Sequence, residues 1–160
     1  MNPVTLGHQH LMEVSLHIFN RLVIGIGHNP LKKSEEGFTL DERLDLIRAC
    51  VSGYGDRVSV QAYEGATVDF ALAINATAMV RGIRNGTDHA YEASMGFANA
   101  LMAEEEGGRR VPTIYLQCPP ELMEISSSRV RELMLLGRSD SVLKHYVAEP
   151  VLELIRSKRA

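Results

Sequence analysis

The sequence predicts an α/β protein in which a doubly wound parallel sheet carries helices on both faces. Three observations support this class: short β-rich runs alternate with helical patterns, the connections between them are short, and the composition is that of an ordinary globular protein, with 45% apolar and 23% charged residues. A length of 160 residues suits one domain, so we expect residues 1–160 to fold around a single core.

The first 74 residues are expected to alternate between helix and strand. Apolar residues at roughly helical spacing predict the first helix, and Thr39 with Glu42 forms a capping-box pattern that predicts the start of the second. The expected elements are, in order, a helix at 6–19, a strand at 21–27, a polar loop at 31–38, a helix from 39 to about 50, a strand at 58–62 and a helix at 67–74.

The second half of the chain continues the alternation. The expected elements are a strand at 78–80, a helix at 88–104, a solvated loop at 104–110, a strand at 112–116, a helix at 126–136 and a helix at 150–158. Gly137 is typical of a helix end, and Pro150 suits the first turn of the last helix. Ligands of such sheets bind at the carboxyl ends of the strands, so residues that follow strands are the candidates for a site.

Charge and cysteine usage exclude several classes of protein. A formal net charge of −3 gives no general attraction to nucleic acid or anionic lipid, and no apolar stretch approaches the roughly 18–20 residues that a membrane helix needs. Cys50 and Cys118 stand far apart, outside any zinc-ligand spacing, and the N-terminus shows no signal-peptide pattern. We expect a cytoplasmic protein that binds neither nucleic acid nor membrane and holds no metal through its own side chains.

Residues 5–8, Thr-Leu-Gly-His, open the first predicted helix. Thr5 and His8 lie three residues apart and therefore share one face of the first turn, while Gly7 leaves room for a ligand. Free N–H groups and a partial positive charge at a helix N-terminus suit phosphate, and His8 can donate to charge that develops during a reaction. A capping threonine beside a surface histidine explains the same four residues equally simply.

Two arginines follow a predicted strand in the segment 81–84, Arg-Gly-Ile-Arg. The planar guanidinium groups of Arg81 and Arg84 match the geometry of phosphate oxygens, and a glycine between them lets the backbone approach a ligand. The alternative interpretation is a pair of surface arginines that bridge carboxylates such as Asp88 or Glu92. The residues alone leave both interpretations open.

Three serines at 126–128 precede a predicted helix. One of them is enough for an N-cap, whereas three hydroxyls with the helix N–H groups form a phosphate cradle. Lys32 and Lys33 lie in a loop after a strand, where lysines are more often solvated than functional. The chain contains no P-loop, H-E-x-x-H or G-x-S-x-G pattern, so the candidate residues are donors and cations rather than nucleophiles.

Four segments together resemble the phosphopantetheine adenylyltransferases, a family of the nucleotidyltransferase superfamily. Residues 2–8 are similar to D-P-x-T-x-G-H, residues 38–43 to F-T-x-x-E-R, residues 81–92 to R-G-x-R-x-x-x-D-x-x-Y-E and residues 125–131 to I-S-S-S-x-V-R/K. The order and spacing agree over nearly the whole chain. The resemblance implies a Rossmann-like nucleotidyltransferase fold in one domain.

The resemblance implies transfer of AMP from ATP to 4′-phosphopantetheine, which gives dephospho-coenzyme A and pyrophosphate in coenzyme A synthesis. Mg²⁺ would accompany ATP, and the acceptor phosphate would attack the α-phosphorus in line, so that positioning and charge stabilisation provide catalysis. The family forms hexamers, so a homo-oligomer is expected. The alternatives are another nucleotidyltransferase with a different phosphate acceptor and a non-catalytic nucleotide-binding protein.

The match also implies roles for individual residues. His8 would stabilise the transition state at the α-phosphate of ATP. The other residues of the ATP site would be Gly82, Ile83, Arg84, Glu92, Leu122, Met123, Glu124, Ile125, Ser126, Ser127 and Ser128, with Arg84 on the triphosphate and Glu92 near the nucleoside. The acceptor would be bound by Lys32, Thr67, Arg81 and Asn99, with Arg81 holding its phosphate.

The sequence departs from the family pattern at its start. The family begins with a strand that ends in G-T/S-F-D-P, whereas this chain starts at Met1 inside that motif and has Asn2 in place of the aspartate. We expect the first strand to be missing, which would leave neighbouring strands without a partner and the core open. The segment 64–68 is also less apolar than its family counterpart.

Overall fold

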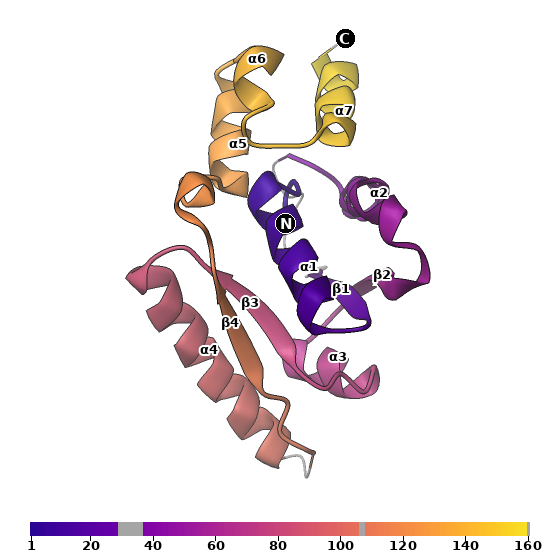
Figure 1. Ribbon diagram of the computed structural model, residues 1–160, viewed down its shortest axis with the longest axis vertical. Coiled ribbons are helices and arrows are strands. Elements are labelled where there is room, and N and C mark those ends of the chain that lie inside the picture. The colour runs from indigo at the N-terminus through magenta and orange to yellow at the C-terminus, as the bar shows by residue number, and fades with distance from the viewer. Residues whose placement is uncertain (29–36, 106–107, 160) are drawn as a thin grey trace. The chain divides into compact units, whose positions relative to one another are not determined.

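The computed structural model describes residues 1–28, 37–105 and 108–159. This part of the chain is α/β, as the sequence predicts, and its elements are shown in Figure 1. They are α1 (Leu6–Ile18), β1 (Leu22–Gly27), α2 (Leu40–Val51), the 3-10 helix η1 (Ser52–Arg57), β2 (Val58–Tyr63), α3 (Thr67–Ala73), β3 (Met79–Ile83), α4 (Gly86–Glu105), β4 (Thr113–Gln117), the 3-10 helix η2 (Pro120–Leu122), α5 (Ser127–Leu135), α6 (Asp140–Leu143) and α7 (Glu149–Arg159).

The described residues group into two compact units. Unit 1 contains residues 1–26, 37–62 and 124–159, and unit 2 contains residues 27–28, 63–105 and 108–123. The single-domain organisation of the chain stays a prediction. Within the described residues, no helix has both the length and the apolar character needed to cross a lipid bilayer.

The core of unit 1 is built from the apolar faces of its helices and of β1. In α2 the buried residues Leu44, Ile47 and Val51 follow helical spacing, and this face packs against α7. The side chains buried most completely in this core are Ile26, Phe38, Ile47, Val130, Leu143, Val151 and Ile155. Burial of one such side chain stabilises the fold by about 1.5–3 kcal/mol, so these helices depend on one another.

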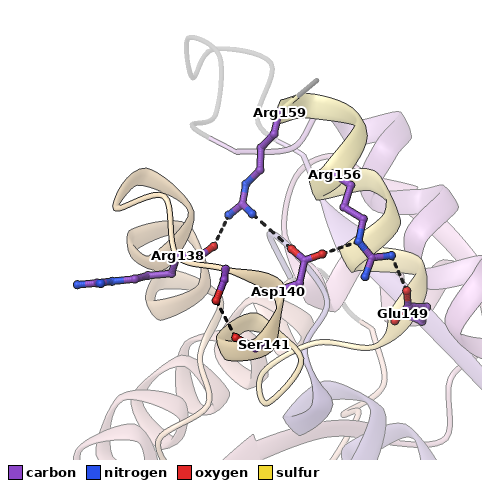
Figure 2. A network of polar contacts seen from close by, with 7 residues as sticks. Arg138, Asp140, Ser141, Glu149, Arg156 and Arg159 are labelled. Atoms are coloured by element: carbon purple, nitrogen blue, oxygen red, sulfur yellow. Dashed lines mark hydrogen bonds and ion pairs between the residues drawn. The ribbon is translucent and has the colours of Figure 1, made fainter.

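A polar network joins α6 to α7 at the C-terminal end of unit 1. Figure 2 shows Asp140 between two arginines of α7, with Arg156 Nε 2.5 Å from one carboxylate oxygen and Arg159 Nη1 3.4 Å from the other. Arg156 also contacts Glu149 at 2.6 Å, and Arg159 donates to the main-chain carbonyl of Arg138 at 2.8 Å. Hydrogen bonds to Asp140 and Glu149 raise the pKa of Arg156 above its ordinary value, so this guanidinium stays charged.

The strands form two pairs, β1 with β2 and β3 with β4. β3 and β4 are parallel, with Met79 opposite Thr113 and Ile83 opposite Gln117. The connection between these two strands runs through α4, as a parallel crossover requires, and Figure 1 shows α4 running alongside the pair. The predicted parallel arrangement is therefore present here in a small sheet.

Tyr115 on β4 fixes the packing of α4 on this sheet. Its hydroxyl donates to the main-chain carbonyl of Glu92 on α4 at 3.1 Å. A Cβ at Gly96 would lie 2.7 Å from the same hydroxyl oxygen, so a glycine is what allows the ring to approach the helix. Arg81 stands opposite Tyr115 in the strand register and pairs with Glu92, which places Arg81 on the face of the sheet covered by α4.

Several expected boundaries are wrong. β3 continues to Ile83, so Arg81 lies within the strand rather than after it, because the main chain of residues 81–83 pairs with β4. α4 begins two residues early, at Gly86, since the side chain of Asn85 accepts from the N–H of Asp88. The short helices η1, η2 and α6 were not predicted, because three to six residues carry no measurable periodicity.

The expected polar loop at 31–38 ends in a buried residue. Phe38 is 0% exposed and belongs to the core of unit 1, which corrects the expectation that the polar loop extends to this residue. Lys32 and Lys33 lie outside the described residues.

Candidate active site

Thr5 and His8 form a reciprocal cap at the start of α1. Thr5 is 1% exposed, its backbone N–H donates to Nδ1 of His8 at 3.1 Å, and its hydroxyl oxygen lies 2.7 Å from the same nitrogen. A ring nitrogen that accepts from a backbone N–H carries no proton, so the neutral imidazole holds its proton on Nε2. The capping interpretation is therefore confirmed, and the cap itself makes Nε2 a hydrogen-bond donor.

The N-terminus of α5 lies against the N-terminus of α1 within unit 1. The hydroxyl of Ser127 donates to the main-chain carbonyl of Pro3 at 2.7 Å. A Cβ at Gly7 would lie 3.9 Å from the carbonyl oxygen of Ile125, so the first turns of both helices are close together. Two helix N-termini side by side concentrate backbone N–H donors and partial positive charge in one place.

The serines at the start of α5 have different partners. Ser126 is the N-cap, as predicted, and its hydroxyl accepts from the backbone N–H of Arg129 at 3.1 Å. The hydroxyl of the exposed Ser128 accepts from Nη2 of Arg131 at 3.3 Å. The first-turn N–H groups of residues 127 and 128 precede the capped one and suit an anion.

The two arginines of the segment 81–84 each pair with a carboxylate of α4 in unit 2. Arg84 contacts Asp88 through two nitrogens, Nε at 2.8 Å and Nη2 at 3.2 Å. Hydrogen bonding from Arg84 holds the pKa of the Asp88 carboxyl below its ordinary value. Nε of Arg81 lies 3.6 Å from Glu92 Oε2, which is an ion pair too long for a hydrogen bond. The bridging interpretation is thus confirmed, with one guanidinium group from within β3 and the other from the residue directly after it.

The carboxyl ends of β3 and β4 are tied together beside Arg84. The backbone N–H of Cys118 donates to the carbonyl of Ile83 at 2.8 Å, and the side chain of Gln117 donates to the carbonyl of Arg84 at 3.5 Å. Burial raises the pKa of the Cys118 thiol, against an opposing effect of Arg84, so the thiol stays protonated near neutral pH. Cys118 is therefore no candidate nucleophile.

Thr67 and Asn99, two polar residues expected in the acceptor site, both lie in unit 2. The hydroxyl of Thr67, in the first turn of α3, lies 2.8 Å from the hydroxyl of Tyr63, whose ring stacks on Phe70 at 4.5 Å between centroids. Asn99 on α4 is 5% exposed, and no hydrogen bond from its side chain occurs among the described residues.

Comparison with known proteins decides the family. The family model described as cytidylyltransferase-like matches residues 1–133. A phosphopantetheine adenylyltransferase of Rhodopirellula baltica is 36% identical over 159 residues, which cover 99% of this chain and 84% of the relative. Relatives of the same name are 36% identical in Streptococcus pneumoniae, over 99% of this chain and 91% of the relative, and 35% identical in Methylocella silvestris, over 98% and 90%.

The chain belongs to the phosphopantetheine adenylyltransferase family. The resemblance inferred from the four sequence segments is thereby confirmed, and so are the Rossmann-like nucleotidyltransferase fold and the class of enzyme, a transferase.

The structure distributes the expected site residues of this family between the two units. Unit 1 holds His8, Glu124, Ile125, Ser126, Ser127 and Ser128, and unit 2 holds Thr67, Arg81, Gly82, Ile83, Arg84, Glu92, Asn99, Leu122 and Met123. Within unit 1 the structure brings His8 and the serines to adjoining helix starts. The convergence of His8 with Arg81 at one edge of the fold stays a prediction.

Sequence reasoning missed two side chains that support this site. Arg131 and Arg43 each donate to a main-chain carbonyl before α1, at 2.7 Å and 2.9 Å. Arg131 is part of the I-S-S-S-x-V-R/K segment, and this position could have drawn attention to it. Arg43 likewise ends the F-T-x-x-E-R segment, although that motif does not name the partner of Arg43, which lies 42 residues away.

Proposed function

We propose that this chain transfers the AMP part of ATP to 4′-phosphopantetheine and releases pyrophosphate, in the penultimate step of coenzyme A synthesis. The observation that carries the proposal is the meeting of the N-termini of α1 and α5 in unit 1, with His8 oriented by Thr5. Two helix starts and an oriented donor suit a triphosphate. Membership of the phosphopantetheine adenylyltransferase family supports the identity of the acceptor.

The proposed reaction is an in-line displacement at the α-phosphorus of ATP. An oxygen of the acceptor phosphate forms a bond to this phosphorus, the bond to the β-phosphate oxygen breaks, and pyrophosphate leaves with the electron pair. His8 donates its Nε2 proton in a hydrogen bond to an α-phosphate oxygen as charge builds there. Removal of such a donor costs about 10²–10³ in kcat.

The ATP contacts of the proposal are those that the match to the family implies. Ser126 and Ser128 would contact the outer phosphates through their hydroxyls, and Ser127 through its main-chain N–H. Arg84 would contact the triphosphate and Glu92 the nucleoside. The remaining contacts, along the main chain and around the adenine, would come from Gly82, Ile83, Leu122, Met123, Glu124 and Ile125.

The acceptor site of the proposal centres on Arg81. Its ion pair with Glu92 is too long for a hydrogen bond, which is compatible with a guanidinium that binds the acceptor phosphate. Asn99, buried on α4, would donate to or accept from the amides of the pantetheine arm. Thr67 would contact the same arm, and Lys32 would contact the phosphates as the acceptor approaches.

Mg²⁺ enters the proposal with ATP, as part of the substrate. In nucleotide sites this ion keeps several waters and is bound mainly by phosphate oxygens, so a cage of protein ligands is not required. Among the described residues there is no group of three or more His, Cys, Asp or Glu side chains arranged to hold a metal ion, which is compatible with that mode. When bound, the ion neutralises charge on the phosphates.

We also propose that the chain is a cytoplasmic homo-oligomer, a hexamer by family membership. α4 supports this, because several of its large apolar side chains are exposed. Ala103 is buried on its inner side, while Tyr91 is 65% and Phe97 66% exposed on other sides. Exposed apolar side chains gathered on one helix are typical of an interaction surface, and a second copy of the chain would cover them here.

The deciding experiment is release of pyrophosphate from ATP by the purified chain. We expect release with 4′-phosphopantetheine as acceptor and a fall of about 10²–10³ in kcat for His8→Ala, with ATP binding retained. His17→Ala is the matched control, because His17 lies exposed in the last turn of the same helix. Release with a different phosphate acceptor would identify another nucleotidyltransferase, and ATP binding without release would identify a non-catalytic nucleotide-binding protein.

A further inference from the structure

Side chains from two other helices hold the main chain directly before α1. Three consecutive carbonyls in this segment each accept one hydrogen bond. These bonds run from Arg43 Nε to Met1 O at 2.9 Å, from Arg131 Nη1 to Asn2 O at 2.7 Å and from Ser127 Oγ to Pro3 O at 2.7 Å. The donors belong to α2 and α5, so contacts distant in sequence, rather than a local turn, determine the direction in which the chain enters α1.

This segment has little freedom to move. Pro3 and Val4 are buried, and Thr5 is the extended N-cap residue that orients His8. The side chain of Asn2 adds a further tie, because its Oδ1 accepts from the backbone N–H of Phe38 at 3.1 Å. A displacement of Asn2 or Pro3 would therefore also displace the first turn of α1.

The three serines of α5 differ in what their hydroxyl protons can do. A serine hydroxyl has one proton, and Ser127 donates its proton to Pro3 O. Ser126 and Ser128 instead accept, from the N–H of Arg129 and from the guanidinium of Arg131, so each keeps a proton for a phosphate oxygen. Ser127 is the serine whose side chain connects the two helix starts.

We propose that Ser127 and Arg131 are positioning residues, which hold the main chain of Pro3 and Asn2 and thereby determine where α1 presents His8. This inference rests on the proposed function, and it gives the side chain of Ser127 a role other than contact with ATP. Arg131 connects the segment before α1 with the start of α5, since one of its nitrogens donates to Asn2 O and another donates to the hydroxyl of Ser128.

The kinetic test compares alanine variants of the serines. Ser127→Ala should lower kcat about 10–100-fold, because a misplacement of about 1 Å at a reacting group costs up to about 10²-fold, while KM for ATP stays within about twofold. Ser128→Ala should raise KM for ATP about tenfold, the loss expected for one hydrogen bond to a charged group. Ser127→Thr keeps a hydroxyl and should restore most of kcat.

Arg57 offers a matched control for Arg131. Nη2 of Arg57 donates to the carbonyls of Leu16 and Phe19, at 2.6 Å and 3.2 Å, and so holds the other end of α1 in the same chemical way. Arg131→Ala should lower kcat, Arg131→Lys should recover part of it, and Arg57→Ala should leave kcat unchanged. Equal losses of kcat in Arg57→Ala and Arg131→Ala would overturn the proposal.

A spectroscopic readout separates this proposal from the proposed function. In the full chain labelled with ¹⁵N-histidine, the imidazole nitrogens of His8, assigned with His8→Gln, should report a proton on Nε2 in the wild type and a mixture of tautomers in Ser127→Ala. A wild type that releases no pyrophosphate would contradict the proposed function, and the His8 spectrum would still test the positioning. An unchanged His8 spectrum, or a raised KM for ATP with unchanged kcat in Ser127→Ala, would refute the positioning role.

Discussion

Nδ1 of His8 has two neighbours from the same residue, the backbone N–H and the hydroxyl of Thr5. Because the N–H can only donate, Nδ1 must accept, and the hydroxyl then donates to the same atom. Protonation of Nδ1 would break the contact with the backbone N–H and reverse the direction of the contact with the hydroxyl. One threonine therefore caps a helix and keeps the donor of the proposed reaction on Nε2.

Thr5→Val tests the role of this hydroxyl. The side chain keeps its shape, but one of the two donors to Nδ1 and the cap of α1 are lost, so we expect kcat to fall about tenfold and the free energy of unfolding to fall by about 1 kcal/mol. Steady-state kinetics and urea unfolding measure these effects. Thr77→Val, at an exposed position, is the control, and equal effects in both variants would contradict the assignment.

Glu42 gives unit 1 a predictable response to acid. Hydrogen bonding from Lys158 lowers the pKa of the Glu42 carboxyl from its ordinary value of 4.5, against a smaller effect of desolvation, and the Lys158–Glu42 distance is 2.7 Å. A carboxyl with a lowered pKa in the folded state stabilises the protein fully above its unfolded-state value. This contribution is lost as the pH falls through the lower folded-state value.

We therefore expect the wild type to exceed Glu42→Gln in free energy of unfolding by about 0.2–1 kcal/mol at pH 7. The advantage should persist down to about pH 4.5 and disappear below it, because protonated Glu42 then resembles glutamine. Glutamine at this position keeps the capping box with Thr39, so the comparison isolates the charge. Chemical unfolding at a series of pH values measures the difference, and an advantage independent of pH would rule out this explanation.

Helix α4 and strand β4 meet at one close approach. The Tyr115 hydroxyl lies where a side chain at position 96 would begin, and it donates to a carbonyl one turn earlier in the helix. Glycine within a helix normally costs about 1 kcal/mol relative to alanine. This cost is offset here by the contact that glycine allows between the helix and the sheet.

Gly96→Ala should destabilise the protein by about 1 kcal/mol or more, because overpacking outweighs the gain in helix propensity. In the Tyr115→Phe background, where the hydroxyl is absent, the same substitution should become neutral or stabilise the protein by up to about 1 kcal/mol. Urea unfolding of the two single variants and the double variant measures this coupling. A destabilisation of equal size in both backgrounds would show that the hydroxyl is not the obstacle.

At the scale of the whole molecule, α4 carries most of the exposed large apolar side chains of the described residues. Its exposed apolar side chains are Tyr91, Met95, Phe97, Leu101 and Met102. We expect Phe97→Glu to dissociate the homo-oligomer, since a charge buried at an interface is costly. Light scattering after size-exclusion chromatography measures the mass. Leu135→Glu is the control, because Leu135 is an exposed leucine of unit 1, and a mass unchanged by Phe97→Glu would exclude α4 from the interface.

The local contacts of the fold and of the candidate site were accessible from the sequence, because their partners lie within a few residues of each other. The Thr39 cap, the Ser126 cap and the Thr5–His8 pair all depend on a spacing of three residues, and the structure contains all three. The pairing of Arg84 with Asp88, one helical turn away, was one of two open interpretations. The spacing of these residues in the sequence identified Asp88 as a partner of Arg84. It could not decide whether Arg84 forms an ion pair with a carboxylate or binds a ligand.

The sequence by itself determined the α/β class, the order of the elements and the family, because periodicity, caps and motifs lie within short stretches of chain. Tertiary structure decided that Phe38 is buried, that β3 includes Arg81, and that Ser127 binds a carbonyl 124 residues away. These features arise where segments distant in the sequence pack together. Packing buries apolar side chains away from water and gives buried main-chain carbonyls a hydrogen-bond donor. No short stretch of sequence contains both partners of such a contact.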